Sequence, residues 1–156
     1  MLKVITYPNQ KLTKKTKHIS RINEPVLKLI EKMKIVMYEY HGVGLSANQV
    51  GKNMALSIIE YNDENISDKN IPFLVLVNPK IIKKEKPYLT TEGCLSLPKQ
   101  EFKVERYDKI ELLNTDLNNN RSKIKTNGFL AQIIQHETDH LNGILLCNIA
   151  INNENI

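Results

Sequence analysis

The segment QHETDHL at residues 135–141 has the composition of a metal-dependent hydrolytic centre. Its two histidines, His136 and His140, are four residues apart, so on an α-helix their Cβ atoms lie about 5–6 Å from each other on one face. Both imidazoles can then bind one metal ion. Glu137 is rotated by about 100° from His136. This places its carboxylate beside the ligand pair, where it can take a proton from water that the metal activates.

A third protein ligand is needed, and the sequence offers one upstream. An extended HExxH pattern has a third histidine six residues after the second one, but this chain has Leu146 at that position. Other HExxH enzymes use a glutamate further downstream, and here the one acid after His140 is Glu154, close to the end of the chain. Cys94 is the attractive candidate, because the glycine before it lets the backbone approach closely and a thiolate binds zinc or ferrous iron strongly. The alternative for Cys94 is a small buried apolar side chain, which is how we interpret Cys147.

The segment GVGLSANQ at residues 42–49 is a third candidate. It has neither the lysine of a phosphate-binding loop nor a dinucleotide fingerprint, and a flexible connector is the alternative interpretation. Its small residues allow an extended peptide backbone to lie close. Gln49 offers an amide donor of the kind that a developing oxyanion needs.

Length and composition indicate one globular domain. The chain has 156 residues, of which 41% are hydrophobic and 25% charged. No apolar run approaches the roughly 20 residues of a membrane helix, and the first residues do not have the pattern of a signal peptide. The two cysteines are therefore expected to be free thiols in a reducing compartment. The net charge of +5 comes from scattered lysines, so we expect no direct nucleic-acid binding.

Two predicted helices must position these residues. Asn23 is a suitable N-cap for a predicted helix over residues 24–40. Asn127 is a suitable N-cap for a second predicted helix over residues 128–141, which carries the two histidines and is apolar over much of its circumference. Strands are predicted over 54–60, 73–77, 81–86, 102–107, 109–114 and 122–126. Asn78-Pro79 is expected to end the second strand, residues 61–70 to form a loop, and residues 149–156 to form a frayed tail.

Taken together, the three segments resemble the peptide deformylase family. That family carries GxGLAAxQ, EGCLS and QHExDHLxG in this order, and here the corresponding blocks span residues 42–143. The resemblance implies a single catalytic domain over residues 1–156 with an α+β fold, in which antiparallel sheets pack around the metal-bearing helix. It also implies removal of the N-formyl group from formylmethionine at the start of nascent polypeptides, with release of formate.

The resemblance also implies roles for individual residues. One divalent metal ion is held by three ligands, with water in the fourth position: Cys94, His136 and His140. Ferrous iron is the expected metal in vivo, with zinc, nickel or cobalt as alternatives. Glu137 carries the proton, and the oxyanion is held by the metal, the Gln49 amide and the Leu95 backbone N–H.

The substrate is expected to lie along the glycine-rich segment. The Gly44 backbone would align the peptide as an added strand. Val43, Phe129 and Ile133 are candidates for the pocket of the methionine side chain, and ordinary core packing explains the last two equally well.

Two acidic residues are expected to support the site, and one serine departs from the family pattern. Glu92 can orient His136 or His140 through the second ring N–H. Asp139 is expected to be buried in an apolar helix and to pair with Arg106. Ser46 stands where the family usually has alanine, and its hydroxyl needs a partner if it is buried.

The resemblance implies that the partners are formylated nascent peptides, with transient proximity to the ribosome and no association with a membrane. It also implies a cytoplasmic location, which is the host cytoplasm if the chain is phage-encoded, and an organelle is the alternative. Many family members continue into a C-terminal helix associated with ribosome contact, and residues 149–156 are too short and polar for that helix. Two other functions compete. A metal-dependent peptidase is disfavoured by Leu146, and an inactive metal-binding module is disfavoured by the presence of both Glu137 and Gln49.

Overall fold

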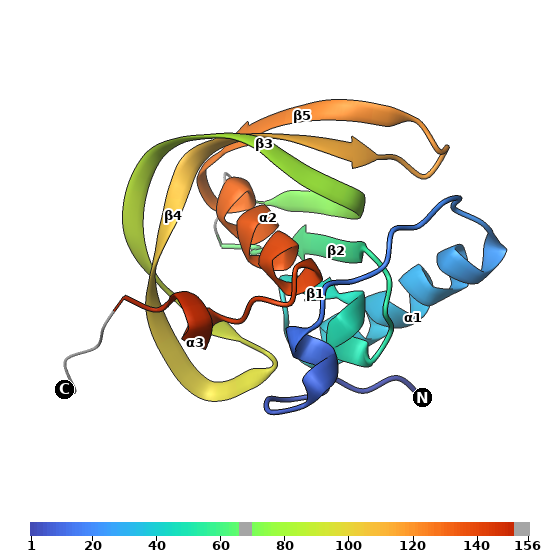
Figure 1. Cartoon of the computed structure of the whole chain (residues 1–156), viewed down its shortest axis with the longest axis horizontal. Coiled ribbons are helices and arrows are strands. Elements are labelled where there is room, and N and C mark those ends of the chain that lie inside the picture. The colour runs from blue at the N-terminus through green and yellow to red at the C-terminus, as the bar shows by residue number, and fades with distance from the viewer. Residues whose placement is uncertain (66–69, 152–156) are drawn as a thin grey trace.

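The helix that carries the QHETDHL motif, α2 (Gly128–Leu141), lies at the centre of the molecule, and a curved antiparallel sheet wraps around it (Figure 1). The computed structural model describes residues 1–65 and 70–151. Within them, the sheet has five strands in chain order: β1 (Gly44–Ser46), β2 (Leu56–Tyr61), β3 (Ile71–Cys94), β4 (Leu97–Thr115) and β5 (Arg121–Asn127). The remaining elements are the helices α1 (Glu24–Glu39) and α3 (Leu146–Ile149) and the 3-10 turns η1 (Gln10–Thr13) and η2 (Ala47–Val50). The expected α+β class is confirmed, with the strands in one sheet.

Helix α1 forms as the sequence predicts, one residue shorter. The Asn23 side chain accepts a hydrogen bond from the Val26 N–H, and Pro25 occupies the first turn, where a missing N–H is harmless. The apolar stripe spaced by three and four residues is buried in a cluster shared with β1, β2 and β3. Past the end of the helix, the Gly42 N–H donates to the Met37 carbonyl, and the chain enters β1.

Strands β3 and β4 are longer than predicted. The predicted stop at Asn78-Pro79 is wrong, because β3 continues through it, and the predicted segments 102–107 and 109–114 join into β4. Asn78 has a φ of 50°, and the pairing with β4 shifts between Val77 and Lys80. This irregularity in the pairing accommodates Pro79, which cannot donate a backbone hydrogen bond, and the strand continues beyond it. The predicted loop over 61–70 begins one residue later, after β2, and residues 66–69 lie outside the described part of the chain.

Polar side chains fasten α2 to β4. Asn127 precedes the helix as predicted, but its side chain does not cap it; the Gly128 N–H donates instead to Asp108 Oδ1 at 3.2 Å. The Gln135 side chain accepts from the Tyr107 N–H at 3.0 Å and donates to the Tyr107 carbonyl at 2.8 Å. The residue before the first histidine therefore holds the middle of the helix against the sheet.

The chain beyond α2 is more ordered than predicted. Ile149 ends α3 and packs against an apolar cluster, and the Ile151 N–H donates to the Lys103 carbonyl at 2.8 Å. Residues 149–151 therefore lie against the fold, in contrast to the predicted frayed tail, and 152–156 lie outside the described residues. Cys147, which was expected to be a small buried apolar side chain, is exposed.

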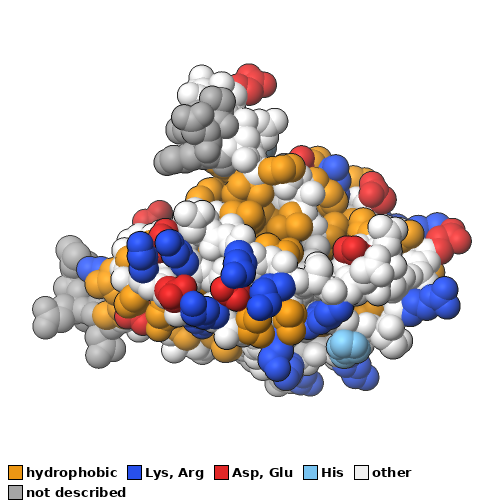
Figure 2. All heavy atoms as spheres, turned by 90° about the horizontal axis from the view of Figure 1, so that it is seen from above, with side chains coloured by type: hydrophobic (Ala, Val, Ile, Leu, Met, Phe, Trp, Pro, Cys, Tyr) orange, Lys and Arg blue, Asp and Glu red, His pale blue; other side chains and the backbone are white. Residues whose placement is uncertain are grey.

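The surface mixes charges of both signs. Glu111 lies 3.7 Å from Lys123 and 3.3 Å from Lys125, and Lys83 lies 3.2 Å from Glu85. Figure 2 shows basic and acidic side chains next to each other on one face of the molecule. No helix within residues 1–65 and 70–151 is long and apolar enough to cross a membrane.

Candidate metal centre

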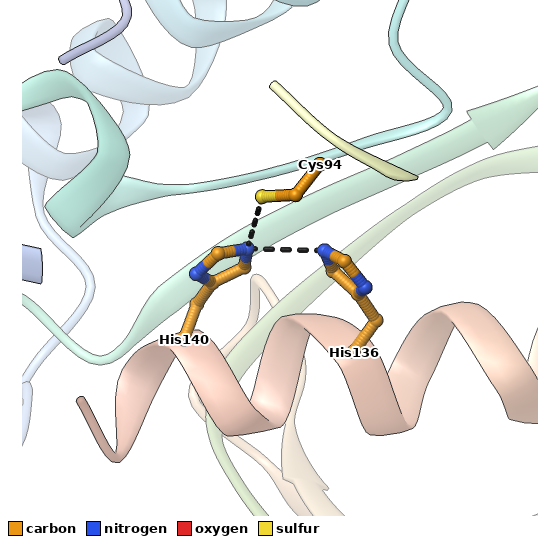
Figure 3. A group of neighbouring side chains, drawn as sticks. All are labelled: Cys94, His136 and His140. Atoms are coloured by element: carbon orange, nitrogen blue, oxygen red, sulfur yellow. Dashed lines mark hydrogen bonds between the residues drawn. The ribbon is translucent and has the colours of Figure 1, made fainter. Parts of the chain in front are cut away.

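The three predicted metal ligands point toward one another (Figure 3). His140 Nε2 lies 3.1 Å from His136 Nε2 and 3.3 Å from Cys94 Sγ, and the three ligand atoms all lie within 4.8 Å of one another. Around a tetrahedral transition metal, two nitrogen ligands are about 3.3 Å apart and a nitrogen and a thiolate sulfur about 3.6 Å. The donor set therefore has the size and chemistry of a site for a divalent transition metal.

Two elements distant in sequence build this centre. Both histidines project from the same face of α2, as their spacing predicts. Cys94 is the last residue of β3 and pairs with Leu97 across the tight turn into β4. Because β3 and β4 curve around α2, that turn brings the thiol to the helix.

Glu92 orients the first histidine. Its Oε1 lies 3.1 Å from His136 Nδ1, which directs Nε2 of the ring to the metal site. Burial raises the pKa of Glu92, but hydrogen bonds from His136 and Arg106 outweigh it and lower the pKa to about 2. Burial lowers the pKa of His136, but its contacts with Cys94 and Glu92 outweigh that effect and raise the pKa to about 10. The second histidine has no such partner among the described residues, since Nδ1 of His140 is buried without a hydrogen bond.

The expected Asp139–Arg106 pair is present, as part of a larger network. Arg106 Nη1 donates to Asp139 Oδ2 at 2.6 Å, while Nε and Nη2 donate to both oxygens of Glu92 at 2.9–3.2 Å. Arg106 is only 4% exposed, whereas the Asp139 side chain is 27% exposed, so the expectation that Asp139 is buried is wrong. The buried member of the pair is the arginine, which links α2 to β3 through two carboxylates.

Glu137 lies against β1. It is 3% exposed, and its Oε2 accepts a hydrogen bond from Ser46 Oγ at 2.6 Å. A Cβ atom on Gly44 would lie 2.4 Å from Glu137 Oε1, so only glycine leaves room for this carboxylate. Burial raises the pKa of Glu137 above the usual range of a glutamate. A carboxylate with a raised pKa is suited to accept a proton and return it near neutral pH.

Gln49 presents its amide group to the ligand cluster. Its Nε2 donates to Ser96 Oγ at 3.2 Å and lies 3.7 Å from Cys94 Sγ. Its Oε1 accepts a hydrogen bond from the Ser46 N–H at 2.9 Å. This bond determines that the donor end of the Gln49 amide, the nitrogen and not the oxygen, faces the Cys94 thiol.

A cavity of about 980 Å³ opens over the centre. Its lining includes all of the residues predicted to contact the substrate or the oxyanion: Val43, Gly44, Gln49, Leu95, Phe129 and Ile133. Tyr40, His41 and Lys99 also line it. These three were not predicted from the sequence, because none lies in a segment with a metal-binding pattern.

Three comparisons agree on the family. The family model described as polypeptide deformylase matches residues 1–155. The peptide deformylase of Thermodesulfovibrio yellowstonii is 39% identical over 146 residues, covering 94% of this chain and 87% of that protein, and that of Desulfotalea psychrophila is 37% identical over 145 residues, covering 93% and 85%. The crystal structure of a peptide deformylase from Synechococcus elongatus in complex with actinonin superposes with a TM-score of 0.86 at 36% identity, covering 97% of this chain and 79% of that one. The chain therefore belongs to the polypeptide deformylase family of enzymes.

Proposed function

We propose that this enzyme removes the N-formyl group from the N-terminal formylmethionine of nascent polypeptides and releases formate. The observation that carries the proposal is the cluster of Cys94, His136 and His140 next to a cavity that Cys94, His136 and Glu137 line, in a chain of the deformylase family. The family match over residues 1–155 also supports the proposal that residues 1–156 act as one catalytic domain. Its place of action would be the cytoplasm, or an organelle that makes formylated chains, in transient proximity to the ribosome.

Cys94, His136 and His140 would hold one divalent metal ion. We propose ferrous iron, with zinc, nickel or cobalt as alternatives, because thiolate and imidazole ligands suit all of them. When bound, the ion polarises the formyl carbonyl and makes water a stronger acid. Glu92 would keep the His136 ring in the orientation and tautomer that ligation through Nε2 requires.

The remaining chemistry belongs to the residues around the cavity. Glu137 would take a proton from the water that attacks the formyl carbon and deliver it to the amine when the C–N bond breaks. The Gln49 amide and the Leu95 backbone N–H would donate to the oxygen on which negative charge develops. Formate and a free N-terminal amine result.

The edge of the sheet would bind the peptide. β1 is the first strand of the sheet and pairs only with β2 within the described residues, and Gly44 lines the cavity, so a substrate backbone can add alongside it. Val43, Phe129 and Ile133 would surround the methionine side chain. Val43 and Ile133 also belong to an apolar core cluster, so they would serve as both core and pocket wall.

One assay distinguishes this function from its competitors. The protein is purified anaerobically with ferrous iron and incubated with formyl-Met-Ala-Ser. Release of formate supports the deformylase, whereas cleavage of an internal peptide bond favours a metal-dependent peptidase, and the absence of both products favours an inactive metal-binding module. A Glu137→Gln variant with full metal content is the matched control and should release no formate above background.

A further inference from the structure

Ser46 is a fully buried hydroxyl beside Glu137, at a position where the deformylase motif usually has alanine. Its Oγ lies 2.6 Å from Glu137 Oε2, 3.2 Å from the Glu137 carbonyl oxygen and 2.7 Å from Ser57 Oγ. Ser57 is also fully buried, and it is the partner of Ser46 in the pairing of β1 with β2. The two hydroxyls therefore form a chain that leads from the interior of the sheet to the carboxylate.

The number of available protons determines which group donates in each of these hydrogen bonds. An ionised glutamate only accepts hydrogen bonds, and each serine has one proton to donate. When Glu137 is ionised, as it must be to accept a proton, Ser46 therefore donates to Glu137 Oε2 and Ser57 donates to Ser46 Oγ. The donation from Ser57 polarises the Ser46 hydroxyl and strengthens its bond to the carboxylate.

The two carboxylate oxygens of Glu137 are held differently as a result. Oε2 is bound by Ser46, whereas Oε1 lies against Gly44, and both Gly44 and Glu137 line the cavity. We propose that Ser46 is a positioning residue that anchors Oε2 and so presents Oε1 to the attacking water. This inference rests on the proposed role of Glu137 as proton carrier.

The hydroxyl can be tested separately from the backbone of Ser46. The Ser46 N–H orients Gln49 by donating to its Oε1, and this contact remains when the side chain is replaced by alanine. A Ser46→Ala variant therefore removes the bond to Glu137 and leaves the orientation of the amide intact. Alanine is also smaller than serine, so it fits the buried position.

The experiment measures formate release from formyl-Met-Ala-Ser by the wild type, Ser46→Ala, Ser57→Ala and the double variant at equal metal content. We expect Ser46→Ala to lower kcat about tenfold and to leave KM within about twofold, because the carboxylate loses one charge-assisted hydrogen bond while the substrate contacts remain. Ser57→Ala should lower kcat about threefold alone and have no further effect in the Ser46→Ala background, because Ser57 acts through Ser46.

A buried hydroxyl elsewhere provides the control. Thr16 Oγ1 donates to the Leu141 carbonyl at 2.9 Å, at the end of α2, so Thr16→Val should lower the melting temperature and preserve kcat. Wild-type kcat in Ser46→Ala, a loss of activity that lies entirely in KM, or equal effects of Ser57→Ala in both backgrounds would overturn the proposal. If Ser46→Ala fails to fold, Ser57→Ala decides alone, since an unchanged kcat overturns the proposal. A wild-type enzyme that releases no formate refutes the proposed function instead, so the two failures are distinguishable.

Discussion

Replacing Arg106 by leucine should destabilise the protein more than the removal of any exposed charged side chain. Arg106 is buried and donates three hydrogen bonds to Glu92 and one to Asp139. Leucine leaves the buried Glu92 carboxylate without the guanidinium that donates to both of its oxygens. Breaking a buried ion pair from one side costs about 3–5 kcal/mol. We expect a loss of about 3–4 kcal/mol in the free energy of unfolding.

The measurement is urea unfolding at pH 7 with the same metal at the same free concentration for every variant. Lys28→Leu is the matched control, because it breaks the exposed pair of Lys28 with Glu24 on α1 and should cost less than about 0.5 kcal/mol. Adding Glu92→Gln to Arg106→Leu removes the unpaired charge, so the double variant should recover part of the stability.

Two results would refute this reasoning. A loss below about 1 kcal/mol for Arg106→Leu would mean that the network contributes no more than surface pairs do. A double variant less stable than Arg106→Leu would show that the cost does not arise from the unpaired Glu92 carboxylate.

Three further predictions concern the metal centre, the proton carrier and pH. Cys94→Ala should lose most of its bound metal, measured by elemental analysis after gel filtration, and retention of a full equivalent would contradict the third ligand. Gly44→Ala should lower kcat at least tenfold, because the added Cβ would come within 2.4 Å of Glu137 Oε1; unchanged kcat in steady-state assays would show that the carboxylate position is not critical. The folded-state pKa of Glu92 is depressed, so its contribution to stability is complete above pH 4.5 and is lost as the pH falls toward about 2. Urea midpoints between pH 6 and 2.5 should therefore fall more steeply for the wild type than for Glu92→Gln, and parallel curves would exclude this linkage.

The cluster of Cys94, His136 and His140 and both long helices could be predicted from the sequence because their patterns are local or part of a motif. The spacing of His136 and His140 determines their common face on any helix, and Asn23 and Asn127 mark where helices begin. The bounds of the strands were harder to predict from the sequence, because Asn78-Pro79 has the composition of a turn yet lies within β3.

Supporting polar residues were the hardest to foresee from sequence. Ser57 lies opposite Ser46 only because of the register of β1 with β2, and Asp108 caps α2 only because β4 passes its first turn. Such partners depend on tertiary pairing, which one sequence does not reveal. Arg106 with Asp139 was foreseen because the family resemblance supplied the position of the basic residue.

The central position of α2 has a consequence for the order in which this protein is made. The strands that wrap around it, β2, β3 and β4, all precede it in the chain, and their apolar side chains close over Ala131, Ile133 and Ile134. Synthesis proceeds from the N-terminus, so all five strands of the sheet leave the ribosome before the helix that covers its inner face. His136 and His140 follow all five strands, so a nascent chain that ends before α2 contains Cys94 but lacks both histidines. The cluster of Cys94, His136 and His140 can therefore assemble only after α2 has been made and has packed against the sheet.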